Sequence, residues 1–200
     1  MGNPALDAFK FLLGTVLDLY AMVVALRFIM QTVRADYYNP ISQFIVKATD
    51  PLLRPLRRVV PSAGRYDTAS LLLCFAILLA KFLLFKALGF GVVAEFGYRL
   101  PVGAMGIPSL FAAAFVNLVN LFFNVFIFSL FAQALMSWLP DAGRSPVAGL
   151  LRSITAPVLA PVRRFVPPMG GLDLSSLVAI IGLYAVRLFV VGSLASLLIR

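Results

Sequence analysis

The sequence predicts an all-α membrane protein with four transmembrane helices in two parallel repeats, each with in-plane amphipathic helical segments. One observation behind this prediction is composition. Of the 200 residues, 62% are hydrophobic and only 12% are charged, and the mean hydropathy is +0.99, whereas a soluble domain carries about a quarter charged residues. The other observation is a repeat. Residues 49–72 read TDPLLRPLRRVVPSAGRYDTASLL and residues 155–178 read TAPVLAPVRRFVPPMGGLDLSSLV, with twelve of 24 positions identical at an offset of 106.

Four apolar stretches are long enough to cross the hydrocarbon core of a bilayer, which takes about 20 helical residues. We expect the spans at about residues 11–33, 69–93, 108–139 and 174–199. The first stretch is longer than the core of a signal peptide and has no small-residue cleavage site, so we expect a retained anchor. The chain then divides into a first repeat over 1–93, a turn-rich connection over 94–107 and a second repeat over 108–200.

Basic residues predict the orientation of the spans. The segments 34–68 and 140–173 hold ten Lys or Arg residues, whereas the termini and the central connection hold three. Because cytoplasmic loops carry the excess of Lys and Arg, both basic segments are expected in the cytoplasm and both termini outside. The formal net charge of +9 is thus concentrated beside the spans. This distribution favours anionic lipid headgroups as partners, and no contact with nucleic acid is predicted.

Each basic segment also has the period of an amphipathic helix. In the first segment, apolar residues follow the spacing i, i+3, i+4, i+7, i+11 on one face: Ile41, Phe44, Ile45, Ala48 and Leu52. Pro51 and Pro157 are expected to interrupt these helices, with Asp50 as the N-cap of a second short helix. We expect the segments to lie in the headgroup plane. Five arginines would then contact lipid phosphates or a partner protein, namely Arg54, Arg57, Arg58, Arg163 and Arg164.

Polar side chains within the spans are costly in lipid unless they are paired or hydrated. Asp18 and Lys81 lie at similar depths in their spans, which predicts an ion pair, and the corresponding residues of the second repeat are Asn124 and Arg187. The whole intramembrane set is Asp18, Arg27, Lys81, Asn117, Asn120, Asn124, Gln133 and Arg187. It fits interhelical bonds that hold the bundle together, a hydrated pathway for ions, or a docking surface for another membrane protein.

Other polar residues favour structural roles. Asp67 and Asp173 each precede a span and have a serine three residues later, which is typical of helix caps. The chain contains no histidine and a single cysteine, Cys74, so it lacks the usual ligands of zinc, haem and iron–sulfur centres. We find no nucleophile–base set and no phosphate-binding glycine loop. We therefore predict no catalytic residues, no metal, no cofactor and no enzyme activity.

The repeated motif resembles a known family. The pattern T-x-P-x-L-x-P-x-R-R-x-x-P, followed by G-x-x-D-x-S and an apolar span, is similar to that of the YggT/YlmG family of small bacterial and plastid membrane proteins. Bacterial members often carry two copies of the domain, and the resemblance covers nearly the whole chain. Departures are modest, with Ala69 where the second copy has Ser175 and Ala156 where the first copy has Asp50.

The resemblance implies a location in the bacterial inner membrane and a broad range of roles. Family members are linked to osmotic tolerance and potassium uptake, to envelope or division organisation, and in plastids to cytochrome complex assembly and nucleoid distribution. We therefore expect a non-enzymatic scaffold or assembly factor that binds anionic lipids and either another membrane protein or itself. The alternative is a component of osmotic stress tolerance and of potassium or other cation transport.

Overall fold

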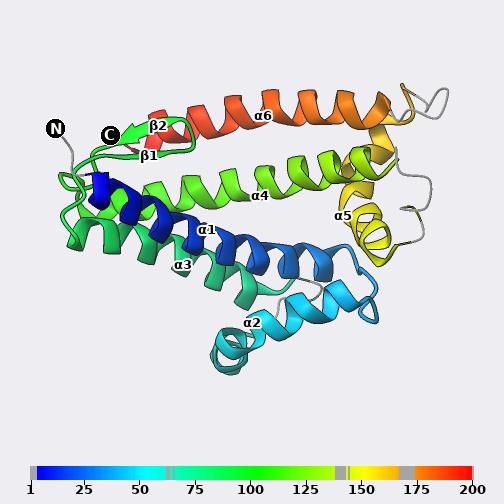
Figure 1. Cartoon of the computed structure of the whole chain (residues 1–200), viewed down its shortest axis with the longest axis horizontal. Helices are drawn as coiled ribbons and strands as arrows, with labels where there is room; N and C mark the ends of the chain where they lie inside the picture. The colour runs from blue at the N-terminus through cyan, green and yellow to red at the C-terminus, as the bar shows by residue number, and fades with distance from the viewer. Residues whose placement is uncertain are drawn as a thin grey trace.

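A computed structural model of the chain describes residues 4–61, 64, 66–137, 143, 145–166 and 174–199. Its four longest apolar helices are α1 (Pro4–Thr32), α3 (Thr68–Ala87), α4 (Ile107–Ser137) and α6 (Leu174–Leu198). Each is long and apolar enough to cross a membrane, with mean hydropathies between 1.9 and 2.3, so the chain is a multi-pass membrane protein. The four helices lie side by side, and the two ends of the chain lie at the same end of the bundle (Figure 1).

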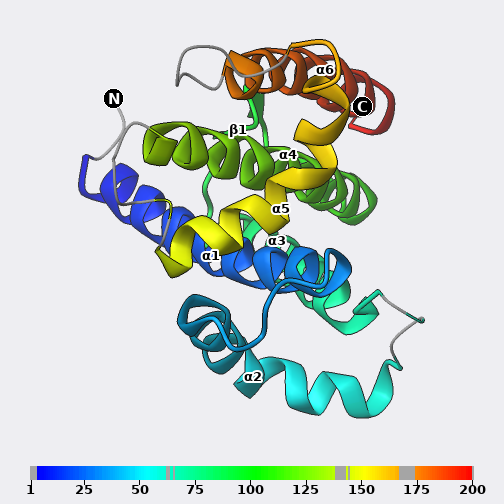
Figure 2. The same cartoon turned by 90° about the vertical axis from the view of Figure 1, so that its right-hand side faces the viewer.

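The central helix of the bundle is α4. Within each repeat the two spans pack together, α1 with α3 and α4 with α6, and α4 also contacts α1 and α3 of the first repeat. Figure 2 shows α4 between α6 and the pair formed by α1 and α3. The largest cluster of buried apolar side chains includes Val24 of α1, Phe82 of α3 and Leu110 of α4. The core therefore joins the two repeats, and α6 is the least buried of the four spans.

Two further helices, α2 (Pro40–Val59) and α5 (Pro146–Val162), lie at the opposite end of the bundle from the termini (Figure 1). Both begin with a polar N-cap followed by proline at the first helical position, which suits the fixed φ of proline. The side chain of Asn39 accepts the backbone N–H of Ile41, and the side chain of Ser145 accepts that of Ala148. In Figure 2, α5 crosses in front of α4 and α1.

The predicted break at Pro51 and Pro157 is wrong, because α2 and α5 each continue through two internal prolines. Asp50 consequently lies inside α2 and is not an N-cap. Proline removes a backbone donor from the helix, so Pro51 leaves the carbonyl of Lys47, four residues earlier, without a helical donor. Polar side chains bond to two other carbonyl groups of the same turn. The Thr49 hydroxyl donates to Ile45 O at 2.7 Å, and Arg27 donates to Val46 O at 2.9 Å.

The single apolar face expected for α2 is divided in two. Ile45 and Leu53 are buried against the bundle, whereas Phe44 and Val59 are 67% and 80% exposed. Neighbouring residues of a helix point about 100° apart, so Phe44 cannot share the direction of Ile45. The inward apolar residues hold α2 to the spans, and the outward ones lie on the surface of the protein.

The connection between the repeats contains a β-hairpin that the sequence analysis did not predict. α3 ends at Ala87, well before the expected end of the second span at residue 93, and Gly89 follows with a φ of +73°. Strands β1 (Val93–Glu95) and β2 (Tyr98–Leu100) pair antiparallel. Phe96 and Gly97 between them both have positive φ, as in a two-residue type I′ turn. The span was predicted too long because the residues after Gly89 are also largely apolar.

Replacing Gly97 with alanine should destabilise the hairpin. Gly97 has a φ of +92°, and an L side chain in left-handed backbone costs roughly 1–2 kcal/mol. Thermal unfolding in detergent should show a lower Tm for Gly97→Ala than for the wild type. Gly91→Ala is the matched control, because a Cβ there meets open space and φ lies outside the left-handed region. Equal Tm values for the two variants would contradict this account of the turn.

Candidate functional site

Polar side chains within and beside the bundle gather in two places. The first, which we name the lysine cluster, comprises Asp18, Lys81, Glu95 and Asn117. The second, which we name the arginine cluster, comprises Arg27, Thr49, Asp50 and Arg54. The lysine cluster lies in the half of the bundle nearer the hairpin, and the arginine cluster lies where α1 meets α2.

The lysine cluster is built around a fully buried ammonium group. Lys81 Nζ of α3 lies 2.7 Å from Asp18 Oδ1 of α1 and 2.9 Å from Glu95 Oε1 of β1, and the lysine side chain is 0% exposed. Asp18 and Lys81 thus form the ion pair that their depths predict. Asn117 Nδ2 of α4 donates to Glu95 Oε2 at 3.4 Å. Three spans and the hairpin meet at this one charge.

Glu95 was missed by the sequence analysis. It is the only glutamate of the chain and the only acid between the second and third spans. A single acid next to spans that contain basic residues could have indicated a partner for Lys81. Burial raises the pKa of the Glu95 carboxyl, because the opposing effect of Lys81 is smaller, and the charge of Asp18 adds to the rise. A cavity of about 730 Å³ adjoins the cluster, lined by Asp18, Glu95, Lys10 and Arg99 among others.

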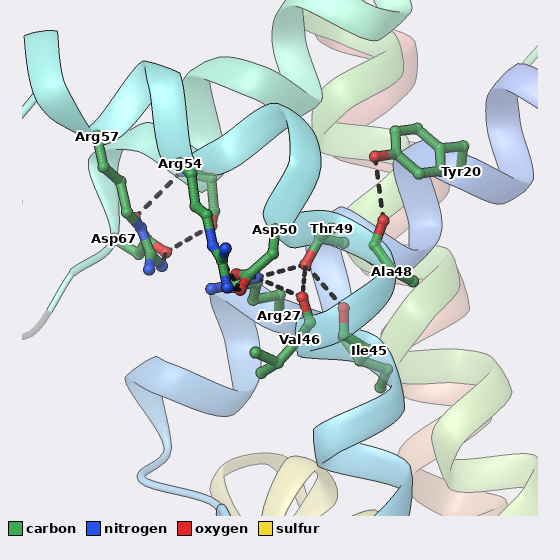
Figure 3. Close-up of polar contacts among 11 residues, drawn as sticks. Tyr20, Arg27, Ile45, Val46, Ala48, Thr49, Asp50, Arg54, Arg57 and Asp67 are labelled. Atoms are coloured by element: carbon green, nitrogen blue, oxygen red, sulfur yellow. Dashed lines mark hydrogen bonds and ion pairs between the residues drawn. The ribbon is translucent and has the colours of Figure 1, made fainter.

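The arginine cluster ties α1 to the middle of α2 (Figure 3). Arg27 Nη1 lies 2.6 Å from Thr49 Oγ1 and 2.7 Å from Asp50 Oδ1. Arg54 Nε donates to Asp50 Oδ2 at 3.1 Å. Burial raises the pKa of Asp50, but hydrogen bonds and charge from Arg27 and then Arg54 outweigh that effect, so the pKa lies below its ordinary value. The carboxylate therefore stays ionised and holds two arginines.

Asp67 is the N-cap of α3. It accepts the backbone N–H of Ser70 at 3.3 Å and the Ser70 hydroxyl at 2.5 Å, and it forms an ion pair with Arg57. Burial raises the pKa of Asp67, but the hydrogen bonds from Arg57 and Ser70 outweigh burial and hold the pKa below its ordinary value. Asp173, the corresponding residue of the second repeat, lies outside the described residues.

The five arginines predicted to contact phosphates have different surroundings. Arg54 and Arg57 pair with acids of the chain, Asp50 and Asp67. Arg58, Arg163 and Arg164 are exposed. Within the part of the chain that the structure describes, Arg58 and Arg164 make no such ion pair. Because these two residues occupy the same position of the repeat, each repeat presents one of them at its surface.

The second repeat keeps the same contacts with fewer charges. The Thr155 hydroxyl hydrogen-bonds to Gln133 Oε1 of α4 and lies 2.8 Å from Leu151 O, matching the contact of Thr49 with Arg27. Arg187 Nε donates to Asn120 Oδ1 at 2.8 Å, so its partner is Asn120 and not Asn124. Asn117 bonds to Glu95 of the hairpin and Asn120 bonds to Arg187 of α6, so these two amides of α4 have different neighbours.

Comparison with known proteins identifies a family. The model of the CCB3/YggT family matches residues 6–88 and again residues 112–194. The "Uncharacterized protein in proC 3'region" of Vibrio alginolyticus is 42% identical over 178 residues, which is 89% of this chain and 90% of that protein. The "Uncharacterized protein YggT" of Escherichia coli is 37% identical over 184 residues, which is 92% of this chain and 89% of that protein. No solved structure matches the chain.

Replacing Lys81 with methionine should strongly destabilise the protein, because Asp18 and Glu95 lose their shared counter-ion. Breaking a buried ion pair costs about 3–5 kcal/mol, measurable as reduced resistance to denaturant in detergent. The double variant Lys81→Met/Glu95→Gln should lose less than the sum of the two single variants, since the second change removes an uncompensated carboxylate. Simple additivity would show that the two groups do not interact.

Asp67 should contribute stability that depends on pH. Its pKa is lower in the folded protein than the unfolded value of about 3.9, so its contribution is complete above that value and is lost as pH falls through the folded pKa. Thermal unfolding from pH 7 to pH 3 should show a lower Tm at pH 7 and a weaker acid dependence for Asp67→Asn than for the wild type. Asp7→Asn, at an exposed carboxylate, serves as control. An unchanged acid dependence in Asp67→Asn would contradict the assignment.

Proposed function

Because the chain belongs to the CCB3/YggT family, we propose that it is a scaffold or assembly factor of the bacterial inner membrane that performs no catalysis. The observation that carries this proposal is the pair of amphipathic helices α2 and α5 at one end of the bundle. Together with the short turn after α5, they form what we name the platform. In this proposal the platform contacts a partner membrane protein and anionic lipid.

The surface of the platform combines apolar and basic side chains. On α2 the exposed residues include Phe44, Val59, Lys47 and Arg58. After α5, Phe165 is 85% exposed beside Arg164, and it occupies the position of Val59 in the repeat. Such a surface suits the headgroup region, where apolar groups insert among acyl chains and arginines meet anionic groups. Its duplication gives the protein two contact surfaces on one side.

Polar contacts tie the two halves of the platform to the bundle and to each other, which suits a scaffold. Each half is tied to the span that precedes it, by Arg27 with Thr49 in the first repeat and by Gln133 with Thr155 in the second. The halves also meet each other, because Asn39 Nδ2 donates to Pro146 O at 2.6 Å. A partner that binds α2 is thereby held in a fixed relation to α5.

The excess of Lys and Arg in the segments that contain α2 and α5 supports a cytoplasmic platform with both termini outside. The partner would then be met at the cytoplasmic face of the membrane. Attraction of the basic residues to anionic lipid would orient the platform parallel to the membrane.

A second candidate function, cation transport linked to osmotic tolerance, is favoured by the cavity beside the lysine cluster. The cavity brings solvent to Asp18, whose side chain is 40% exposed. Against this function stands Lys81, since a buried ammonium opposes a passing cation. Both acids of the cluster are already paired with Lys81, so the scaffold is the better-supported proposal.

Photo-crosslinking in cells tests the platform. A photoreactive residue at Phe44 or Phe165 should give adducts with a partner protein, whereas one at Phe115, an exposed residue of α4, should give lipid adducts. Arg58→Gln/Arg164→Gln should abolish the protein adducts without preventing membrane insertion, and Arg58→Lys/Arg164→Lys should retain part of them, because the charge remains. Lipid adducts alone at every position would overturn the scaffold proposal.

Flux measurements separate the two functions. Folded protein in anionic-lipid vesicles should give no potassium or proton flux above that of empty vesicles if it is a scaffold. Flux that is lost or changed in Lys81→Ala or Arg187→Ala would instead establish the transport function. Circular dichroism of the same vesicles controls for loss of fold in either variant.

A further inference from the structure

Each repeat has a cavity at the same place, between the end of its first span and its amphipathic helix. The first cavity, of about 460 Å³, is lined by residues that include Arg27, Met30, Gln31, Tyr37, Arg54 and Arg57. The second, of about 190 Å³, is lined by residues that include Gln133, Met136, Ser137, Arg152 and Arg163. Six lining positions correspond at the repeat offset of 106, namely 27 with 133, 30 with 136, 31 with 137, 37 with 143, 46 with 152 and 57 with 163. A cavity that recurs in two diverged repeats is not a local packing defect.

The lining of both cavities is basic. The first cavity is lined by three arginines and one acid, Asp50, and one of these arginines, Arg57, also pairs with Asp67. The second is lined by Arg152 and Arg163, with no acid among its described lining residues. The ion pair of Arg27 and Asp50 corresponds to the neutral Gln133 and Ala156 in the second repeat, whereas Arg54 corresponds to Ala160 and Arg152 to Val46. Each cavity thus keeps two arginines besides the position of Arg27 and Gln133.

The arginines of the first cavity have donors left for a ligand. Arg54 is 78% exposed and Arg57 is 40% exposed, and each is paired with one carboxylate. A guanidinium carries five N–H donors in a planar fork that matches the oxygen atoms of phosphate. Figure 3 shows both side chains projecting from neighbouring turns of α2, on the side where Arg27 lies. Tyr37 also lines this cavity.

The position of the cavities along the spans indicates the depth in the membrane at which a ligand would lie. Arg27 lies five residues before the end of α1 at Thr32, and Gln133 lies four residues before the end of α4 at Ser137. At 1.5 Å per residue these are depths of about 8 and 6 Å from the ends of the spans. This is the region in which the phosphate groups of a bilayer lie, beyond a hydrocarbon core of about 30 Å.

We propose that the two cavities are paired phosphate-binding sites, one in each repeat. The ligand is a phosphate group held by Arg54 and Arg57 in the first site and by Arg152 and Arg163 in the second. The phosphate belongs either to an anionic phospholipid headgroup or to a soluble phosphate compound, since both present the same oxygen atoms. These sites are distinct from the exposed platform residues Arg58 and Arg164, and the proposal does not depend on the scaffold function.

Native mass spectrometry of the detergent-purified chain tests the sites with phosphatidylglycerol as the probe and phosphatidylcholine as the neutral comparison. The wild type should retain up to two phosphatidylglycerol molecules. Arg54→Gln and Arg152→Gln should each lose one, with affinity reduced roughly tenfold or more, as expected when a charge-assisted bond is removed. Arg99→Gln is the control, because it removes an exposed arginine of the hairpin that lines neither cavity, and it should retain both lipids.

A second arm distinguishes the source of the phosphate. Inorganic phosphate added to delipidated protein should raise Tm in the wild type and less so in Arg54→Gln/Arg152→Gln if the ligand is soluble. Size-exclusion profiles establish that each variant is folded. Retention of phosphatidylglycerol or stabilisation by phosphate, lost with the cavity arginines, supports the sites. Absence of both effects, or equal losses in the control variant, overturns them.

Discussion

Burial of the Lys81 ammonium is the constraint on which the membrane-embedded part of the fold depends. An unpaired charge in the interior would cost several kcal/mol, and two acids from different elements compensate it, Asp18 of α1 and Glu95 of β1. Because Glu95 pairs with Lys81, the hairpin lies against the bundle, and Glu95 also contacts Asn117 of α4. One charge thus couples the first repeat, the connection and the second repeat.

The two repeats attach the amphipathic helix to the preceding span at the same position but through different side chains. A span residue, Arg27 or Gln133, meets the threonine that precedes the first internal proline of the amphipathic helix. Ionic contacts in the first repeat become neutral hydrogen bonds in the second, although the geometry is maintained. The contact between span and amphipathic helix therefore depends on the threonine and the proline-containing helix, which both repeats have. The charges at this contact differ between the repeats.

Much of the fold was predictable because it follows from composition and period. The four spans, the two repeats and the pairing of Asp18 with Lys81 follow from apolar length, internal identity and depth. What escaped prediction depends on tertiary contact. Pro51 ends a helix by local rules, yet α2 continues through it, and Ile45 before and Leu53 after the proline are both buried against the bundle. The pairing of Glu95 with Lys81 could not be predicted, because it depends on the hairpin. The strands of the hairpin are only three residues long and lie among apolar residues, so the sequence shows no alternation of polar and apolar residues that would indicate them.

The placement of Glu95 also matters for biosynthesis. It follows Lys81 by only 14 residues, and Asp18 precedes Lys81, so both acids are translated before α4. The nascent chain thus contains both partners of Lys81 before the second repeat is synthesised. Arg187 likewise finds Asn120 already made. Each of these two cations of the spans therefore has its bonding partners translated before the second repeat is made or before the cation itself.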